Sequence, residues 1–461
     1  MDYIKVVDLI HEIPPKDRDK LRQLLSSICK DEVYQLYTCI VRRLNNGIDL
    51  TNASLWKDVY ANKPINLNIF RKRCLELLRN IEICLPYIQL ASENTTALLL
   101  KYYAQHHIDK FYEDQWEKSK QINVPTDSEE ILLEYQLNYT HYNYLIQHPI
   151  KAKQNHIPAT DQTLDTHYFL QKIKLICHAL NEAQFTKFDY TVQNADFIIE
   201  RIENSLLKTH PIISIYLHIY ALFTHSQPDE HLTKTKEILS RLSALHTQEQ
   251  KTIYQYFINF CIIQINRGHA HFEQELLDIF ISYNQTISDP YISPFRFKNI
   301  VNLSLKLKRY AFAEEFITHY GQKLPEDIRS TTIAFNMAKL YYETKKYDMA
   351  IDTLLYTVND DLTYNLSAKL LIAKTFYEKG EYTFLSSFLE SFRIYILRNK
   401  EMNTTLKKNY HVFIRFCGKL IALQNKKEKE IAAFNTKILS MENLPDKLWL
   451  LEKINELGLS L

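Results

Sequence analysis

The stretch from residue 333 to 392 most constrains the fold of this chain, because one pattern of small and aromatic residues occurs in it twice. The first copy consists of Ala338, Tyr341, Ala350 and Leu354, and the second, 35 residues later, of Ala373, Phe376, Leu385 and Leu389. A small residue lets a second helix approach closely, and an aromatic residue three positions on fills the space beside it. The pattern therefore predicts two consecutive helical hairpins.

The segments between the expected helices have the composition of tight turns. Residues 344–346 separate the helices of the first hairpin and residues 379–381 those of the second, where Gly380 can take the left-handed conformation that ends a helix. A related unit lies upstream, with Tyr310, Ala313 and Ile317 placed 37 residues before their counterparts. At least three units are expected in succession.

This pattern resembles the tetratricopeptide repeat (TPR), whose period is about 34 residues. The resemblance is clearest over roughly residues 295–392. The sequence departs from that family in having no Trp at the start of a unit, and only Pro325 fits the expected proline at a unit's end. The resemblance implies an all-α fold, an α-solenoid of antiparallel helix pairs wound into a superhelix.

The rest of the chain predicts helices as well. Residues 1–150 form an N-terminal helical region, in which one helix is expected from about Leu67 to Leu85, ended by Pro86, and another over residues 96–118. The irregular, proline-containing segment 149–165 is the expected boundary. Residues 165–425 are interpreted as degenerate TPR-like repeats, six helical pairs in all, and 426–461 as a C-terminal capping helix.

The composition disfavours most enzyme classes. Only 6 of the 461 residues are glycine, whereas phosphate-binding loops and tight turns in sheet-rich enzymes need several. The motifs GxxxxGK[ST], GxGxxG and GxSxG are all absent. We expect a protein that is not an enzyme and that uses no cofactor.

The cysteines and the N-terminus indicate a cytoplasmic protein. The seven cysteines are scattered and contain no CxxC pair, which is typical of reduced, buried thiols. The first residues lack the apolar core of a signal peptide, and no apolar run approaches the ~18 residues that span a bilayer. We therefore expect no membrane insertion.

Three histidine or cysteine groups are candidates for chemistry, but their spacing is poor. His106 and His107 are adjacent, so on a helix their side chains diverge by about 100° and cannot easily share a metal. His141 and His148 lie seven residues apart without a third ligand nearby, and Cys177 and His178 also diverge. Surface or packing roles are the simpler interpretation, and no metal site is expected.

Basic residues are balanced by acidic ones, with 56 Lys and Arg against 54 Asp and Glu. The densest basic group, Arg71 to Arg73, is too small for a face with several phosphate contacts, although Arg42 and Arg43 lie nearby in sequence. Nucleic acid is therefore not the expected partner. The alternative hypothesis is a regulatory protein whose N-terminal helices contact nucleic acid or the transcription machinery.

The TPR resemblance implies a binding surface on the first helix of each unit. The positions that would line its concave groove are Lys298, Asn302, Lys339, Tyr342, Lys374 and Tyr377, with Asn336 beside them. Lys298, Asn302 and Asn336 match positions of the clamp with which some TPR domains hold a peptide's C-terminal carboxylate, whereas Ser367 and Leu371 depart from it. The alternative is that Lys339 and Lys374 are ordinary solvated residues.

The leading hypothesis is a non-enzymatic protein–protein interaction scaffold. A peptide or helix of another protein would lie in the concave face, because concave repeat surfaces commonly bind extended partners. Aromatic side chains would provide contact area and lysines would orient acidic groups.

Overall fold

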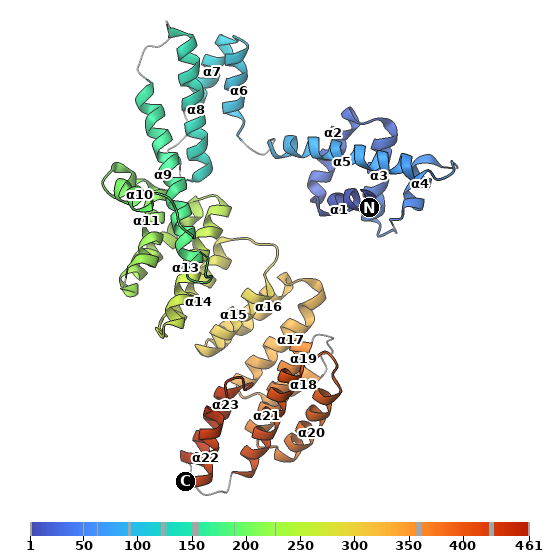
Figure 1. Ribbon diagram of the computed structural model, residues 1–461, viewed down its shortest axis with the longest axis vertical. Coiled ribbons are helices and arrows are strands. Elements are labelled where there is room, and N and C mark those ends of the chain that lie inside the picture. Colours follow the sequence, from blue (N-terminus) through green and yellow to red (C-terminus); the bar gives the residue numbers. More distant parts are fainter. Residues whose placement is uncertain are drawn as a thin grey trace. The chain divides into compact units, whose positions relative to one another are not determined.

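A computed structural model describes residues 2–48, 50–61, 63–90, 94–120, 125, 127–149, 156–188, 190–225, 227–355, 362–423 and 428–459. Within these residues the chain consists of helices and connecting turns, without a β-strand (Figure 1). The predicted all-α class is therefore confirmed.

The α-helices of the described residues are α1 (Asp2–Glu12), α2 (Pro15–Ile28), α3 (Asp31–Asn45), α4 (Asn52–Tyr60), α5 (Leu67–Leu90), α6 (Thr96–Gln105), α7 (Asp109–Ser119), α8 (Ser128–Gln147), α9 (Ile157–Glu182), α10 (Ala195–Glu203), α11 (Pro211–Thr224), α12 (Leu232–Arg241), α13 (Thr247–Asn266), α14 (Phe272–Thr286), α15 (Pro294–Lys306), α16 (Tyr310–Tyr320), α17 (Glu326–Glu343), α18 (Tyr347–Leu355), α19 (Leu362–Glu378), α20 (Tyr382–Arg398), α21 (Thr404–Ala422), α22 (Glu428–Leu439) and α23 (Lys447–Leu459). Short 3-10 helices, such as η5 (Gly321–Lys323), join some of them.

The chain forms two compact units. The first contains Met1–Ala179 and Tyr190–Tyr220, and the second contains Leu180–Asp189 and Ala221–Leu461. Each unit has hydrophobic cores of its own, and the two units are described separately below.

In the first unit, α1, α2 and α3 pack on the long helix α5. We expected this helix to end before Pro86, but it continues to Leu90 with the proline inside it. Proline removes one backbone hydrogen bond of a helix. The helix persists because Ile81, Cys84 and Ile88, on both sides of the proline, are buried in the same core.

Helices α6, α7 and α8 form a second core within the first unit, around Leu100, Tyr112 and Tyr144. We expected one helix over residues 96–118, but the chain turns between α6 and α7 at His107, which has a left-handed φ of 54°. The turn lets α6 and α7 pack on each other. Only a few per cent of residues other than glycine have a positive φ, although histidine is enriched among them, so His107 was a weak signal for the break.

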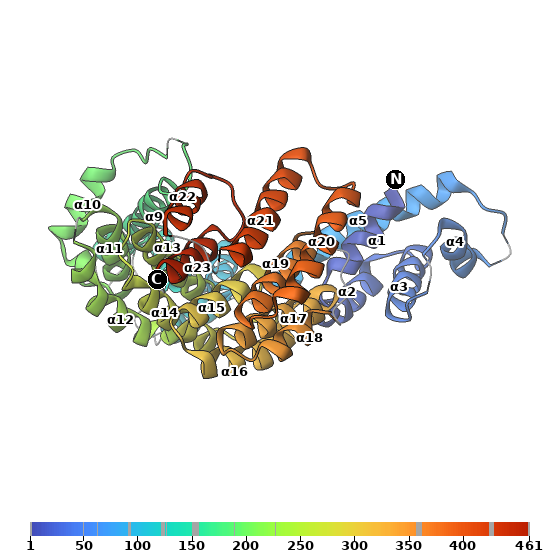
Figure 2. The same ribbon diagram turned by 90° about the horizontal axis from the view of Figure 1, so that it is seen from below.

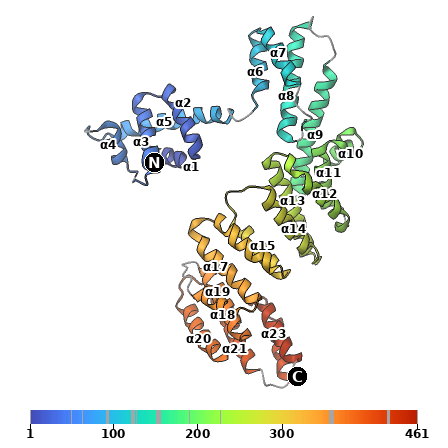
Figure 3. The same cartoon turned by 180° about the vertical axis from the view of Figure 1, so that it is seen from behind.

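Helix α9 runs alongside α8 (Figures 1 and 3). It begins at Ile157, inside the segment 149–165 that we expected to be irregular. The irregular part of that prediction, residues 150–155, lies outside the described residues.

In the second unit, each helix from α13 to α21 packs on the next helix along the chain or on the next but one (Figure 2). Helix α13 packs on α14, α15 on α16, α17 on α18 and α19 on α20, as the hairpin pattern predicts. Contacts also join α15 to α17 and α17 to α19. The pairing expected for the two earlier hairpins, before residue 245, stays a prediction.

Four helices of the second unit end in the same way. Gly268, Lys308, Lys345 and Gly380 all have positive φ, at intervals of 40, 37 and 35 residues. At each of them the backbone N–H donates to the carbonyl three residues back, and the next N–H donates to the carbonyl five residues before it. This is the Schellman arrangement, which satisfies the last carbonyls of a helix. The predicted turns therefore have one common backbone geometry.

The C-terminal region contains two helices, α22 and α23, where we expected one. They pack on each other, and α23 also packs on α21. Trp449, Leu450 and Ile454 of α23 are buried in one core with residues of α19, α20 and α21, such as Phe392. The last helix is thus an integral part of the second unit.

Candidate functional site

The residues predicted to line a groove lie on three helices of the second unit. They are Lys298 and Asn302 on α15, Asn336, Lys339 and Tyr342 on α17, and Lys374 and Tyr377 on α19. We call this surface the α15–α17–α19 face. Since α17 packs on both α15 and α19, the three helices hold these side chains on neighbouring elements.

Lys339 is the centre of the first half of the face. Its ammonium donates a hydrogen bond to Asn302 Oδ1 over 2.9 Å, and Nζ lies 4.8 Å from the ring centroid of Phe335. Burial lowers the pKa of Lys339 to about 8, and the positive charges of Lys298 and Lys374 contribute to the same direction. A lysine in this environment favours a negatively charged ligand. An anion would offset both the cost of burying the ammonium group and its repulsion by the neighbouring lysines.

Asn336 lies one helical turn before Lys339 and is only 2% exposed. Its amide nitrogen donates to the Thr332 carbonyl over 2.8 Å. Its carbonyl oxygen, Oδ1, is buried and lacks a hydrogen-bond partner within the described part of the chain. A buried acceptor without a partner costs free energy, so a ligand that donates to Oδ1 would recover it.

The second half of the face is in contact with α23. Lys374 Nζ lies 3.3 Å from Asp446 Oδ1, just before α23, and 6.0 Å from the ring centroid of Trp449. The ring of Tyr377 meets the ring of Trp449 edge to face, with 5.3 Å between centroids. These two predicted groove residues therefore bind the chain's own last helix.

Glu378, which sequence reasoning missed, is the centre of this second half. Its Oε1 accepts hydrogen bonds from the Tyr342 hydroxyl over 3.2 Å and from the Trp449 indole over 2.9 Å. Lys453 Nζ lies 2.9 Å from the same oxygen. Burial and the Glu378 carboxylate raise the pKa of Tyr342. Glu378 is separated from Trp449 by 71 residues, and local periodicity carries no signal for such a pair.

The face therefore consists of two parts. The open half contains Lys298, Asn302 and Lys339, where Lys298 is exposed. The α23 half contains Tyr342, Lys374 and Tyr377, which pack against α23 or contact residues that do. The structure brings together Lys339 with Asn302, and Tyr342 with Lys374, whose Nζ lies 5.4 Å from the Tyr342 ring centroid.

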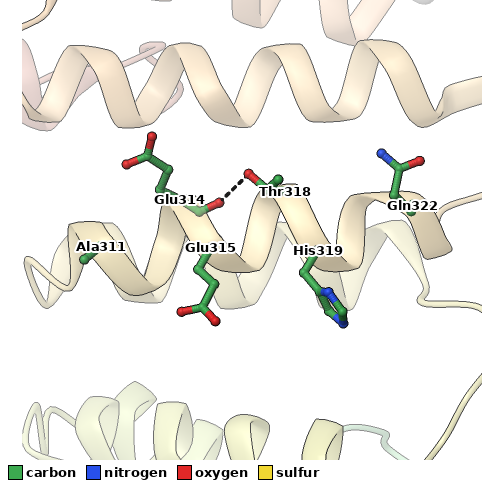
Figure 4. A pocket seen from close by; sticks show the side chains of 6 residues that line it. All are labelled: Ala311, Glu314, Glu315, Thr318, His319 and Gln322. Atoms are coloured by element: carbon green, nitrogen blue, oxygen red, sulfur yellow. Dashed lines mark hydrogen bonds between the residues drawn. The ribbon is translucent and has the colours of Figure 1, made fainter.

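A surface hollow of about 600 Å³ lies elsewhere in this unit, along α16 and η5. Figure 4 shows Glu314, Thr318 and Gln322 on one side of the helix and Glu315 and His319 on the other. Because these groups come from one continuous segment and diverge, they do not converge on a point where a reacting atom could sit.

The histidines weighed as metal ligands have other partners. His141 is buried, its Nδ1 lies 3.2 Å from the Tyr112 hydroxyl, and its ring stacks on Trp116 with 3.8 Å between centroids. His148 Nε2 lies 3.5 Å from an oxygen of Asp109. Among the described residues no three His, Cys, Asp or Glu side chains are arranged to hold a metal ion.

Cys177 is buried, and burial raises the pKa of its thiol. The thiol donates to the Tyr216 carbonyl over 3.3 Å, whereas His178 is exposed. The thiol is thus held in its protonated, unreactive form.

The arginines considered for nucleic acid are largely paired with carboxylates. Arg42 and Arg43 both bind Asp58, at 2.9 Å and 2.7 Å. Arg73 binds Glu32 and Glu76, at 2.9 Å and 2.8 Å. These pairs reduce the positive charge that the N-terminal helices can offer to phosphates.

None of the helices, as far as their residues are described, carries an apolar stretch long enough to cross a bilayer. In comparisons with known proteins, no family model matches the chain, and neither a curated protein nor a solved structure is significantly similar to it.

Proposed function

We propose that the chain is a helical-repeat scaffold that binds an acidic peptide or helix of another protein on the open half of the α15–α17–α19 face. The observation that carries the proposal is Lys339, a half-buried lysine with a lowered pKa beside Lys298 and Asn302. Such a cluster is costly for the free protein, and an acidic ligand would stabilise it.

The neighbouring α23 half supports a helical or extended partner. There the same face already binds the helix α23. Glu378 accepts a hydrogen bond from the Trp449 indole and pairs with Lys453, and Lys374 pairs with Asp446. A partner segment on the open half would continue along this surface, with its acidic side chains near Lys298 and Lys339. We further propose that these helix pairs form a TPR-like solenoid, for which the recurring Schellman turns are the support.

A cytoplasmic location is part of the proposal, and it is supported by the seven cysteines, all of which are free thiols. The alternative function, contact of the N-terminal helices with nucleic acid or the transcription machinery, has less support. Arg42, Arg43 and Arg73 already bind carboxylates of their own unit.

The proposal is tested by affinity purification followed by mass spectrometry, with wild type and the double variant Lys298→Glu/Lys339→Gln. Loss of one partner of a close charge pair costs about 2–5 kcal/mol in a buried interface, so recovery of a bound protein should fall by at least about 10-fold. Lys374→Glu is not used, because Lys374 binds Asp446 and its loss would disturb α23.

The control is Lys346→Glu, which repeats the Lys→Glu change of Lys298 at an exposed residue of the turn after α17. It should recover the same proteins as the wild type. Equal recovery from the double variant and the control would remove the open half as a binding site.

A further inference from the structure

Two rows of exposed apolar side chains follow α8 and α9 in the first unit. The row on α8 has members seven residues apart, and the row on α9 has members at intervals of seven, four and seven. We call the seven together the α8–α9 face: Leu132, Tyr139, Ile146, Ile157, Leu164, Tyr168 and Leu175, each between 36% and 59% exposed. Such spacing forms a stripe on one side of a helix and is typical of helix–helix contact.

The contacts between the two helices define how they lie. Lys174 donates to Ser128 Oγ over 2.8 Å, and at the other end the rings of His141 and His156 lie 4.9 Å apart. Since residues early in α8 meet residues late in α9, the helices are antiparallel neighbours (Figure 3).

Both rows lie on the same side of this pair. The contact residues His167 and Lys174 of α9 are each followed directly by a member of the row, and the contact residues Tyr135 and Ser128 of α8 each stand four positions before a member of the other row. A residue one position further along an α-helix points about 100° further round its axis, and a residue four positions further points about 40° further round in the same sense. When two antiparallel helices touch along one line, a rotation in this sense away from that line brings the side chains of both helices to the same side of the pair. The two rows therefore form one continuous apolar surface.

The other sides of α8 are occupied. Tyr144 stacks on Tyr112 of α7 with 3.8 Å between ring centroids, and α6 packs on α8 as well. The α8–α9 face is thus the outward side of a packed helical group rather than a gap in its core.

The size and charge of this surface fit a second copy of the chain. At about 150–200 Å² for each large side chain and roughly half exposure, the seven residues leave roughly 600 Å² of apolar area open. That is the upper end of what a typical monomer exposes (about 300–600 Å²), and with its polar rim it approaches the ~800 Å² that each partner contributes to a stable complex.

The row on α9 is symmetric about residue 166, since Leu164 and Tyr168, and likewise Ile157 and Leu175, are equally far from it. Asp161 and Lys172 lie beside this row, both on the same flank, and at nearly equal distances along the helix from the same midpoint. A two-fold axis through this midpoint sets Asp161 of each copy near Lys172 of the other, which is the self-complementarity that an isologous dimer requires.

We propose that the α8–α9 face binds the same face of a second copy of this chain, so that two pairs of antiparallel helices form a four-helix contact. The alternative occupant, a single helix of another protein, would not explain the symmetric row or the two opposite charges beside it.

The test is sedimentation velocity on the full chain over a series of concentrations. The wild type should form a dimer at micromolar concentration, and Tyr139→Glu/Leu164→Glu should weaken it by at least about 100-fold, because central apolar anchors carry most of the binding energy. The matched control, Leu206→Glu, changes a side chain of the same unit that is 87% exposed and outside the face. It should dimerise like the wild type.

If the double variant loses helicity by circular dichroism, Ile146→Gln/Leu175→Gln, at the ends of the two rows, decides the question. Wild type that stays monomeric at ~100 μM, well above the Kd of a specific complex, or a folded double variant that dimerises like the wild type, would overturn the proposal.

Discussion

At the scale of single residues, His141 is a buried titratable group of the first unit. It is 7% exposed and lies between the Tyr112 hydroxyl and the Trp116 ring. Burial lowers its pKa from 6.5 to about 4, and the neighbouring His156 contributes to the same direction. The folded protein therefore holds a neutral imidazole at neutral pH.

We predict that acid weakens α7 and α8 through His141. Below pH 6.5 the unfolded chain takes up a proton that the folded chain refuses until about pH 4. The stabilisation is fully present above pH 6.5 and is lost as the pH falls from 6.5 towards 4. A change from pH 7 to 5 should cost about 1–2 kcal/mol of local opening free energy, measured by hydrogen exchange of peptides from these helices.

His141→Phe is the control, since phenylalanine keeps an aromatic ring against Trp116 but cannot take up a proton. After correction for the intrinsic exchange rates, its pH dependence should be clearly smaller. Equal pH dependence in the variant and the wild type would show that another group is responsible.

Residues of the candidate face were predictable only where the repeat frame applies. The frame placed Lys298, Asn302 and Lys339 on neighbouring helices, and the bond between Lys339 and Asn302 agrees with it. It could not place Glu378 or Trp449, because their contact joins segments 71 residues apart without a shared period.

At the scale of elements, the residues at the ends of the helices show which helix boundaries could be predicted from the sequence. Gly380 signalled its turn directly, and the recurring small and aromatic residues placed the turn at Lys345. The turn at His107 has the same hydrogen bonds but no glycine and no repeated neighbour. Pro86 wrongly indicated the end of a helix, because the burial of apolar residues on both sides of it outweighs the loss of one backbone hydrogen bond.

We predict opposite stability changes at two equivalent helix ends. Lys345 has a φ of 59°, which costs a residue with a Cβ more than glycine, so Lys345→Gly should stabilise the second unit by about 0.5–1 kcal/mol. Gly380 has a φ of 77°, and the space that a Cβ would fill there is open, so Gly380→Ala should cost about 1 kcal/mol through the backbone alone. Urea denaturation followed by circular dichroism measures both.

The neighbouring variant Lys346→Gly separates this effect from a general effect of glycine. Lys346 lies one residue further, outside the positive-φ positions of the described chain, and glycine there should be neutral or slightly destabilising. A loss of stability in Lys345→Gly as large as in Lys346→Gly would contradict the argument from backbone strain.

At the scale of the whole molecule, the two compact units have separate cores. The core of α1 to α5 includes Phe70, which is 2% exposed, and the core around α19 to α23 includes Phe392, which is fully buried. The two cores share no residue. A protein with two such cores need not unfold as a single cooperative unit.

We predict two transitions in calorimetry, each of which responds to one member of a matched pair of variants. Replacing a buried Phe by Ala costs about 3–5 kcal/mol, because it removes buried apolar area and leaves a cavity. Phe70→Ala should lower the midpoint of one transition only, and Phe392→Ala that of the other only. Since the chemical change is the same, the two variants control for each other. If calorimetry shows a single transition and both variants lower its midpoint equally, the two units unfold together. The loss of stability in one unit would then reach the other through the helices that continue from one unit into the other.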